Sequence, residues 1–452
     1  MVTIETSLKL RSGLVLPNRL VKAAMTEAMA DDFSRPSKEI CNLYEAWSAG
    51  GTGTLITGNV QIDRRYQERP GNVCIDGPQD EEQCEHLRRW ATACKKHGSK
   101  AIVQLSHAGR QANTQISWSC RSPGNVPMAS PHSMPPWAAK MFVSIPEAFK
   151  KEEVAALPEK FAAAAEVCKR TGFDGIQLHS AHGYLLSSFL NPLANNRPEL
   201  FGEKDPYGGP LENRARLLLE CVRAVRKKTG SDFSISVKLN SADFQAGGFT
   251  TEEAVQVSSW LEKEQIDFLE ISGGNYESGI YGAADTGKKR QSTVQREAYF
   301  LEYAKEVTKV VKDIPIMVTG GFRLKDTMNS ALANKECDLI GLGRPLCGDP
   351  AASQKLLNNS ITELPRYETS VVVGNWLGRL LLQWLLPRMV HAVKLGGVQC
   401  WYYRSMYAIA TTGSPKHKLG AFFCFLWNMI REGKLAKNLK GVNSKGLAHS
   451  PN

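Results

Sequence analysis

Eight short apolar segments, separated by stretches long enough to form a helix, recur along most of the chain. Strands that alternate with helices in this order form a parallel sheet covered by helices. Such a sheet either closes into a (β/α)8 barrel or stays open and doubly wound, and periodicity alone does not distinguish the two. The predicted strands are Leu20–Ala24, Thr54–Thr57, Ala101–Leu105, Gly175–Leu178, Ser234–Leu239, Phe268–Ile271, Ile316–Thr319 and Leu339–Gly341. The fold class is therefore α/β, and the order of chemical motifs along these segments favours the closed barrel.

Three of the intervening segments carry a helical pattern. Lys151–Arg170 has an alanine-rich core, and Leu211–Lys228 and Thr251–Lys263 repeat apolar residues at intervals of three and four. Thr250 and Glu253 stand at the start of the last segment with the spacing of a capping box. We expect an α-helix in each segment.

The positive charge of the chain is concentrated at its C-terminal end. From Arg366 onward the sequence holds 12 Lys or Arg and 2 acidic residues, which accounts for ten units of the net charge of +11. No other shift in composition is as sharp, so we place a domain boundary near Pro365. The expected organisation is a barrel over residues 1–365 and a basic, tryptophan-containing, mostly helical extension over residues 366–452.

The 11 cysteines are scattered, odd in number and without a Cys-x-x-Cys pair. This pattern argues against a disulfide framework and against a zinc or iron–sulfur site, so we expect buried thiols and no metal. The N-terminal residues contain no apolar run of signal-peptide length, so a cytoplasmic protein is the expectation.

A dense group of polar and aromatic side chains follows the fourth predicted strand. His179, His182 and Tyr184 come where the strand ends and a loop begins. In a (β/α)8 barrel the loops after the strands carry the active site. Two histidines three residues apart, taken alone, more often belong to an unrelated loop or helix face. The interpretation as a catalytic group therefore depends on what accompanies them.

Two glycine-rich segments follow the seventh and eighth predicted strands. Gly320 and Gly321 precede Arg323, and Gly343 precedes Arg344. Glycines expose backbone N–H groups to a phosphate, and a neighbouring arginine adds charge-assisted hydrogen bonds. A Gly-Gly pair alone is more often a simple turn, but these two loops are where barrels bind phosphate. The spacing predicts a phosphate site.

The string after the fourth strand closely resembles the Old Yellow Enzyme family of FMN-dependent NADH:flavin oxidoreductases and ene-reductases. The matching pieces are the core His179–Tyr184 and the later segments Asn195–Arg197, Tyr207–Gly209 and Glu212–Arg214. Trp401–Tyr403 resembles a segment of fungal-type members that continue past the barrel. The resemblance covers the predicted barrel with specific motifs and implies that it binds FMN.

The resemblance also implies contacts to the cofactor. Gln104 and Lys238 would meet the N1–C2=O edge of the flavin, which becomes anionic on reduction and needs donors or a cation. Thr26 would donate toward the C4 carbonyl, and Gly58 would let the backbone approach the ring. The alternative for Lys238 is a solvated strand end. The complete predicted set is Ala24, Thr26, Gly58, Gln104, Lys238, Gly320, Gly321, Gly343 and Arg344.

Three positions depart from the family pattern. Ala24 stands where many relatives have proline. Thr26 stands where some have cysteine, so redox tuning by a thiol is not expected. Gln177 replaces the family's usual acidic residue, and the sequence offers no reason for it.

The activity implied by the resemblance is reduction of the C=C bond of an α,β-unsaturated carbonyl compound. NADH or NADPH would reduce FMN, His179 and His182 would bind the carbonyl oxygen, and Tyr184 would supply a proton to the α-carbon. The alternative for Tyr184 is a packed loop aromatic. The sequence predicts neither the substrate nor the nucleotide preference nor the oligomeric state. Residues in long loops that would shape the pocket are Trp118, Trp137 and Tyr281.

Two other functions stay open. The same barrel and cofactor could support oxidation, demethylation or isomerisation of a small molecule. Alternatively, the chain is a non-catalytic flavin-binding scaffold whose basic, tryptophan-bearing tail contacts a membrane surface. A simpler interpretation is that the tail packs on the barrel or forms an oligomer contact. Nucleic-acid binding is not expected, because the basic residues of the tail lie between apolar runs rather than in one cluster.

Overall fold

The computed structural model of the chain describes residues 1–128, 144–272, 303–371, 387–417 and 419–444. Eight parallel strands form its centre, and each predicted strand segment is found within two residues of its expected bounds. The eight strands are β3 (Leu20–Lys22), β4 (Thr54–Ile56), β6 (Lys100–Ser106), β9 (Gly175–Ser180), β10 (Ser234–Asn240), β11 (Phe268–Ser272), β12 (Ile316–Thr319) and β13 (Leu339–Leu342).

These strands close into a barrel rather than an open sheet. β13 pairs with β3 through Ile340 and Leu20, β3 pairs with β4, and β4 pairs with β6. From β6 the parallel pairing continues through β9, β10, β11 and β12 back to β13. The predicted (β/α)8 barrel is confirmed, and because all eight strands are parallel, their carboxyl ends share one face.

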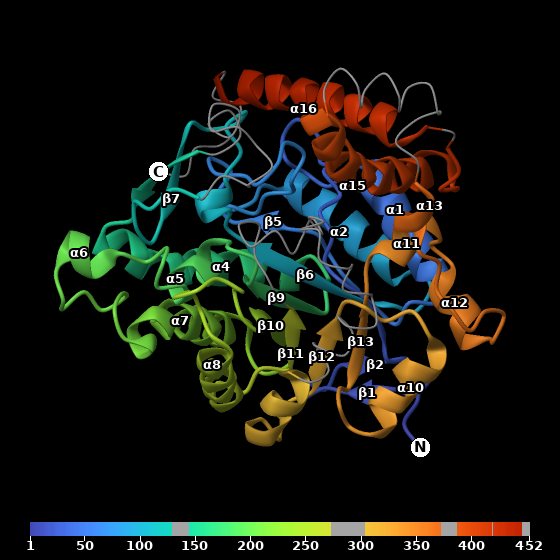
Figure 1. Cartoon of the computed structure of the whole chain (residues 1–452), viewed down its shortest axis with the longest axis horizontal. Coiled ribbons are helices and arrows are strands. Elements are labelled where there is room, and N and C mark those ends of the chain that lie inside the picture. The colour runs from blue at the N-terminus through green and yellow to red at the C-terminus, as the bar shows by residue number, and fades with distance from the viewer. Residues whose placement is uncertain (129–143, 273–302, 372–386, 418, 445–452) are drawn as a thin grey trace.

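Helices cover the outside of the barrel (Figure 1). The three predicted helices are present as α4 (Lys151–Arg170), α7 (Leu211–Thr229) and α8 (Thr251–Lys263). The predicted capping box is also present, because the N–H of Glu253 donates to Thr250 Oγ1 at 3.2 Å and the N–H of Thr250 donates to Glu253 Oε2 at 3.2 Å. Other helices in the described residues of this region include α1 (Lys38–Ala49), α2 (Glu81–Lys95), α5 (Leu185–Leu190), α6 (Arg197–Phe201), α10 (Lys325–Ala333), α11 (Arg344–Gly348) and α12 (Ala352–Leu357), with the 3-10 turn η1 (Gly109–Gln111), and residues 303–310 are helical as well.

The amino end of the barrel is closed by apolar side chains. Interior residues such as Phe268 and Met317 form a cluster with Leu16 of the N-terminal hairpin, which consists of β1 (Leu8–Lys9) and β2 (Val15–Leu16). This arrangement leaves the carboxyl end of the barrel for chemistry. The remaining strands are β5 (Val60–Gln61), which pairs with β6, and the parallel pair β7 (Ser119–Ser122) and β8 (Ile145–Ala148).

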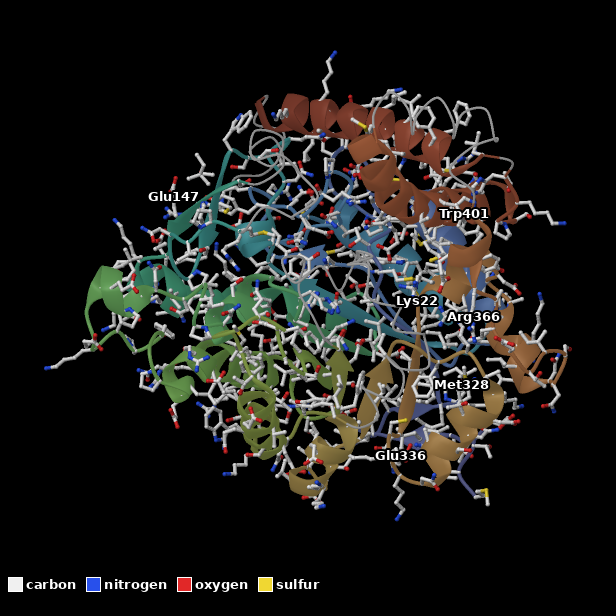
Figure 2. The ribbon with its side chains drawn as sticks, in the orientation of Figure 1. Lys22, Glu147, Met328, Glu336, Arg366 and Trp401 are labelled. Carbon is white, nitrogen blue, oxygen red and sulfur yellow. The ribbon has the colours of Figure 1, made fainter. Side chains whose placement is uncertain are left out.

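The described residues of the extension are mostly helical, as the sequence predicts. They contain α13 (Tyr367–Ser370), α15 (Pro387–Thr412) and α16 (Ala421–Ser444). α15 packs against α1 and α16 packs on α15, and both lie across the top of Figure 1. Asn42 of α1 donates to the carbonyl of Ala410 at 2.9 Å. Figure 2 shows Trp401 on this layer, above the end of the barrel where Lys22 is labelled. The described part of the tail thus packs on the barrel, and the domain boundary near Pro365 stays a prediction.

Two expectations about composition can be compared with the structure. All 11 cysteines have free thiols, and ten of them are buried, as predicted. Among the residues that the structure describes, no helix combines the length and the apolar character needed to cross a bilayer.

Candidate active site

The two histidines and the tyrosine of the predicted catalytic group lie together at the carboxyl end of β9. The rings of His179 and His182 are 5.1 Å apart and nearly perpendicular, and the ring of Tyr184 lies 4.7 Å from that of His179. His182 adopts a φ of 63°, a left-handed conformation that brings its ring back toward His179. Its backbone N–H donates to Asn240 Oδ1 at 3.1 Å, so the end of β10 holds this turn in place.

Both histidines are neutral hydrogen-bonding groups. Burial, with a smaller contribution from the positive charge of Lys238, lowers their pKa values well below the usual range. The N–H of Ala181 donates to His179 Nδ1 at 3.3 Å, so the proton of the neutral ring is on Nε2. His182 Nε2 lies 2.7 Å from Ser272 Oγ. His179 therefore presents an N–H donor at the end of the barrel.

Tyr184 is positioned by the start of a short helix. It is the N-cap residue of α5, and its backbone N–H donates to the carbonyl of Ala181 at 3.3 Å. Gln111 donates to the carbonyl of His182 from the loop after β6. Loops from three neighbouring strands thus fix the three rings relative to one another.

A chain of buried polar side chains crosses the interior of the barrel just below these rings. Gln104 Nε2 donates to Gln177 Oε1 at 2.7 Å, and Gln177 Nε2 donates to Glu270 Oε2 at 2.8 Å. Lys238 Nζ lies 2.8 Å from Glu270 Oε1. The chain links β6, β9, β11 and β10, and its lysine is only 3% exposed. The alternative that Lys238 is a solvated strand end is therefore wrong.

This chain explains the departure at Gln177. Gln177 donates to the Glu270 carboxylate through its amide, which a glutamate at the same position could not do. Two carboxylates at that separation would repel each other in a buried site. The acidic residue that the family pattern has on β9 is here an amide, and a carboxylate is found on β11 instead. In the sequence this carboxylate is recognisable as Glu270, the single charged residue in the apolar run FLEIS.

The loop after β3 carries Ala24 and Thr26, both half-buried. The Thr26 hydroxyl donates to Glu68 Oε2 at 2.9 Å, and Asn59 Nδ2 donates to the same oxygen at 3.0 Å. Glu68 was not among the predicted site residues. The structure therefore pairs Thr26 with a carboxylate of the neighbouring loop.

Gly58 lies beside a second buried carboxylate. Its N–H donates to Glu27 Oε1 at 2.9 Å, and the Tyr44 hydroxyl donates to the same oxygen. A Cβ at position 58 would lie 2.5 Å from the backbone carbonyl oxygen of Met25 and 2.3 Å from Glu27 Oε2, so only glycine fits here. Lys22 donates to the Tyr44 hydroxyl at 3.0 Å, and burial lowers the pKa of Lys22 to about 8. The close approach that requires glycine at this position is therefore to Met25 and Glu27 within the protein itself.

The glycine loops after β12 and β13 form the remaining part of the site. Gly320 and Gly321 have φ values of 119° and 88°, which residues with a side chain rarely adopt, so the loop conformation favours glycine at both positions. The hydroxyl of Thr319 beside them is buried and has no hydrogen-bond partner in the structure. Arg344 follows Gly343, and Arg323 is buried behind the first loop.

The other motifs that carried the family resemblance are structural. Arg197 is buried and holds both carboxylate oxygens of Asp205, at 2.8 and 2.9 Å. Asn195 donates to the carbonyls of Phe189 and Tyr207 at 2.8 Å. They fix the segment that follows Tyr184. Of the residues predicted to shape the pocket, Trp137 and Tyr281 lie outside the described residues, and Trp118 is 66% exposed.

A closed parallel barrel with neutral donors, a buried lysine and a glycine-arginine loop at one end suits an enzyme that binds a phosphate-bearing cofactor. The sequence model of the NADH:flavin oxidoreductase / NADH oxidase family matches residues 7–363, and the chain belongs to this family. It is therefore an enzyme that uses FMN with a nicotinamide nucleotide as reductant, and the predicted Old Yellow Enzyme relationship is confirmed.

Similar proteins come from fungi and bacteria. The NADH-dependent flavin oxidoreductase iliE of Hypocrea jecorina (strain QM6a) is 34% identical over 358 residues, which is 77% of this chain and 88% of that protein. The NADH-dependent flavin oxidoreductase iccE of Talaromyces variabilis is 30% identical over 425 residues, 91% of this chain and 99% of that protein. The Old Yellow Enzyme homologue of Zymomonas mobilis has a TM-score of 0.65 at 21% identity, over 81% of this chain and 96% of that chain, which supports the fold.

The residues at the carboxyl end fit FMN. The positive-φ glycines, the partnerless Thr319 hydroxyl and Arg344 offer donors and charge to a phosphate. Lys238 is buried on β10, directly opposite His179 of the neighbouring strand β9. A cation at this position would stabilise an anionic edge of the flavin ring. This donor set suits a cofactor that is anionic at its phosphate and, when reduced, at its ring.

Proposed function

We propose that the protein reduces the C=C bond of α,β-unsaturated carbonyl compounds, with NADH or NADPH as the electron source. The observation that carries the proposal is the packed group of His179, His182 and Tyr184, in which both imidazoles are neutral. Neutral donors polarise a carbonyl without giving up their protons to it. Relatives described as NADH-dependent favour NADH of the two nucleotides.

In this proposal the histidines bind the substrate oxygen. His179 Nε2–H donates to the carbonyl, and His182, whose ring lies 5.1 Å from that of His179, binds the same oxygen. As the alkene is reduced, negative charge develops on this oxygen, and each such donor lowers the barrier by about 2.7–4 kcal/mol. FMN, when bound, supplies the hydride that the β-carbon accepts. Tyr184 transfers its hydroxyl proton to the α-carbon, a general-acid contribution of roughly 10²–10⁴-fold.

The remaining predicted residues would hold the cofactor. Gly320, Gly321, Gly343 and Arg344 would bind the phosphate. Lys238, oriented by Glu270, would face the ring edge that becomes anionic, together with Gln104. The backbone of the loops that carry Ala24, Thr26 and Gly58 would pack beside the ring.

The test is the visible spectrum of the purified protein without oxygen. Addition of NADH should bleach the flavin absorbance, and addition of cyclohexenone should then restore it. Recovery with oxygen but not with the enone would contradict alkene reduction and favour the alternatives, which are oxidation, demethylation or isomerisation of a small molecule. A parallel series with NADPH measures the nucleotide preference.

A second function is favoured by one face of α16. Three exposed apolar side chains recur on this face at intervals of three and four residues; they are Phe423, Leu426 and Ile430, which are 58%, 46% and 65% exposed. The same face continues with two exposed lysines, Lys434 and Lys437. An apolar and basic helical face suits an anionic membrane surface. We include peripheral membrane contact as a second proposal. Sedimentation with phosphatidylserine vesicles, but not with phosphatidylcholine vesicles, would support it, and equal recovery in the supernatant with both would contradict it.

A further inference from the structure

A carboxylate of the extension contacts both arginines of the phosphate end. Glu368 lies in α13, immediately after the predicted boundary of the barrel. Its Oε1 lies 3.3 Å from Arg323 Nη2 and 3.4 Å from Arg344 Nη1. Its other oxygen, Oε2, accepts a hydrogen bond from the Tyr402 hydroxyl of α15 at 2.9 Å. A carboxylate held between two helices of the extension therefore contacts both guanidinium groups.

We propose that Glu368, held by Tyr402, is a positioning residue for the phosphate of FMN, so that the extension completes the cofactor site. This proposal rests on the assignment of the glycine-arginine loops to the phosphate. Glu368 does not touch the cofactor itself. It orients the two arginines. Arg323 Nη1 donates to the carbonyl of Phe322, and its buried Nε, which has no hydrogen-bond partner among the described residues, would bind the phosphate together with Arg344.

The burial of the groups supports a fixed arrangement. Arg323 is 4% exposed, whereas the Arg344 side chain is 40% exposed and can receive a ligand from outside. A buried guanidinium needs a counter-charge, and Glu368 supplies it. The neighbouring arginines hold the pKa of Glu368 below its usual range against the effect of burial, so the carboxylate is ionised.

The position of α13 is itself determined by packing. The ring of Tyr367 lies against Gly348 of α11, where a Cβ would be 2.3 Å from Tyr367 Cε2. On its other side this ring lies 5.4 Å from the ring of Trp401 in α15. Glu368 follows Tyr367 directly, so the same contacts that attach the extension to the barrel also place the carboxylate.

Glu368 is placed to orient the arginines rather than to compete with the phosphate. It engages one nitrogen of each guanidinium, and an arginine has five N–H donors. Its second oxygen is tied to Tyr402, which keeps the carboxylate on the side of the extension. The cluster of Glu368 and the two arginines carries one negative and two positive charges. Its net charge therefore stays positive, as binding of a phosphate dianion requires.

The experiment compares FMN with riboflavin, which has the same ring and no phosphate. Apoprotein of the full chain is titrated with each flavin, and binding is measured by the quenching of flavin fluorescence. Glu368→Gln should weaken FMN binding by about tenfold and leave riboflavin binding unchanged. Tyr402→Phe keeps the carboxylate and should act in the same direction with a smaller effect, which also covers the case in which the first variant does not fold.

Glu363→Gln is the matched control. Glu363 lies five residues earlier and pairs with Arg366 at 3.0 Å at the surface, so its loss should change the affinity for neither flavin.

Equal losses for FMN and riboflavin in Glu368→Gln would overturn the proposal, since they would mean general damage to the fold. Unchanged or tighter FMN binding would overturn it as well, with tighter binding identifying Glu368 as a competitor. Failure of the wild-type protein to prefer FMN over riboflavin would instead refute the phosphate assignment.

Discussion

The interior of the barrel has two layers that differ in chemistry although they belong to the same strands. In β6, Ile102 belongs to the apolar layer and Gln104 to the polar chain; in β11 the corresponding residues are Phe268 and Glu270. Side chains two residues apart on a strand point to the same side, so one step along these two strands replaces an apolar contact by a hydrogen-bonding group. The lower layer stabilises the fold and the upper layer, with the loops above it, carries the chemistry.

The largest expected effect is that of a change above the upper layer. Tyr184→Phe removes the hydroxyl and keeps the ring, so reduction of the flavin by NADH should proceed at the wild-type rate. The subsequent reduction of an enone should slow by about 10²–10⁴-fold, because the general acid is lost. Stopped-flow absorbance of the two half-reactions measures both rates.

Tyr207→Phe is the control for this change. Tyr207 belongs to the structural segment after the active-site loop, and its hydroxyl donates to Glu220 at 3.1 Å. Both half-reactions should be unchanged in this variant. An enone half-reaction of wild-type rate in Tyr184→Phe would remove Tyr184 as the proton donor.

A change in the lower layer should have the opposite signature. Phe268 is completely buried between the hairpin and the strands, and Phe268→Ala should reduce the free energy of unfolding by about 3–5 kcal/mol through lost contacts and a cavity. The rate of flavin reduction per folded molecule should be unchanged. Urea denaturation gives the first quantity and stopped-flow absorbance the second. Slower flavin reduction in the folded fraction would show that the two layers are not independent.

The contribution of the polar chain to stability can be tested by adding a second carboxylate to it. Gln177→Glu places a second carboxylate against Glu270, which should destabilise the protein by about 1–3 kcal/mol at pH 8. Repulsion raises the pKa of this pair of carboxyls in the folded state, so the folded state binds more protons than the unfolded one. The loss should therefore shrink as the pH falls toward 5.

The double variant Gln177→Glu with Glu270→Gln restores one acid and one amide to the chain. It should recover the part of the loss that comes from carboxylate repulsion, but not the contribution of the buried ion pair, because Lys238 loses the carboxylate that lies 2.8 Å from its Nζ. If the double variant is no more stable than Gln177→Glu, contacts other than the direct pair determine the effect.

The sequence predicted the strands and the residues at their ends better than the hydrogen bonds and ion pairs that these residues form. Strand positions follow from local apolar runs, and Lys238 and Gln104 could be placed at strand ends from their order along the chain. The partners of Lys238 and Thr26 could not be predicted in the same way, because Glu270 and Glu68 meet them only after the barrel has closed. Glu368 was out of reach for the same reason, since α13 reaches Arg323 from beyond the predicted barrel.

The smallest expected effect concerns pH and the rim of the barrel. His107 follows β6, and burial lowers its pKa to about 4. The unfolded chain has an ordinary histidine pKa near 6.5, so between these values the unfolded state binds more protons and stability falls as the pH falls. In His107→Phe the slope of unfolding free energy against pH between 6 and 4 should decrease by about 1.4 kcal/mol per pH unit. Phe268→Leu, a change in the apolar layer, should leave this slope unchanged, because no group there titrates. An unchanged slope in His107→Phe would mean that this histidine does not contribute to the acid sensitivity of the rim.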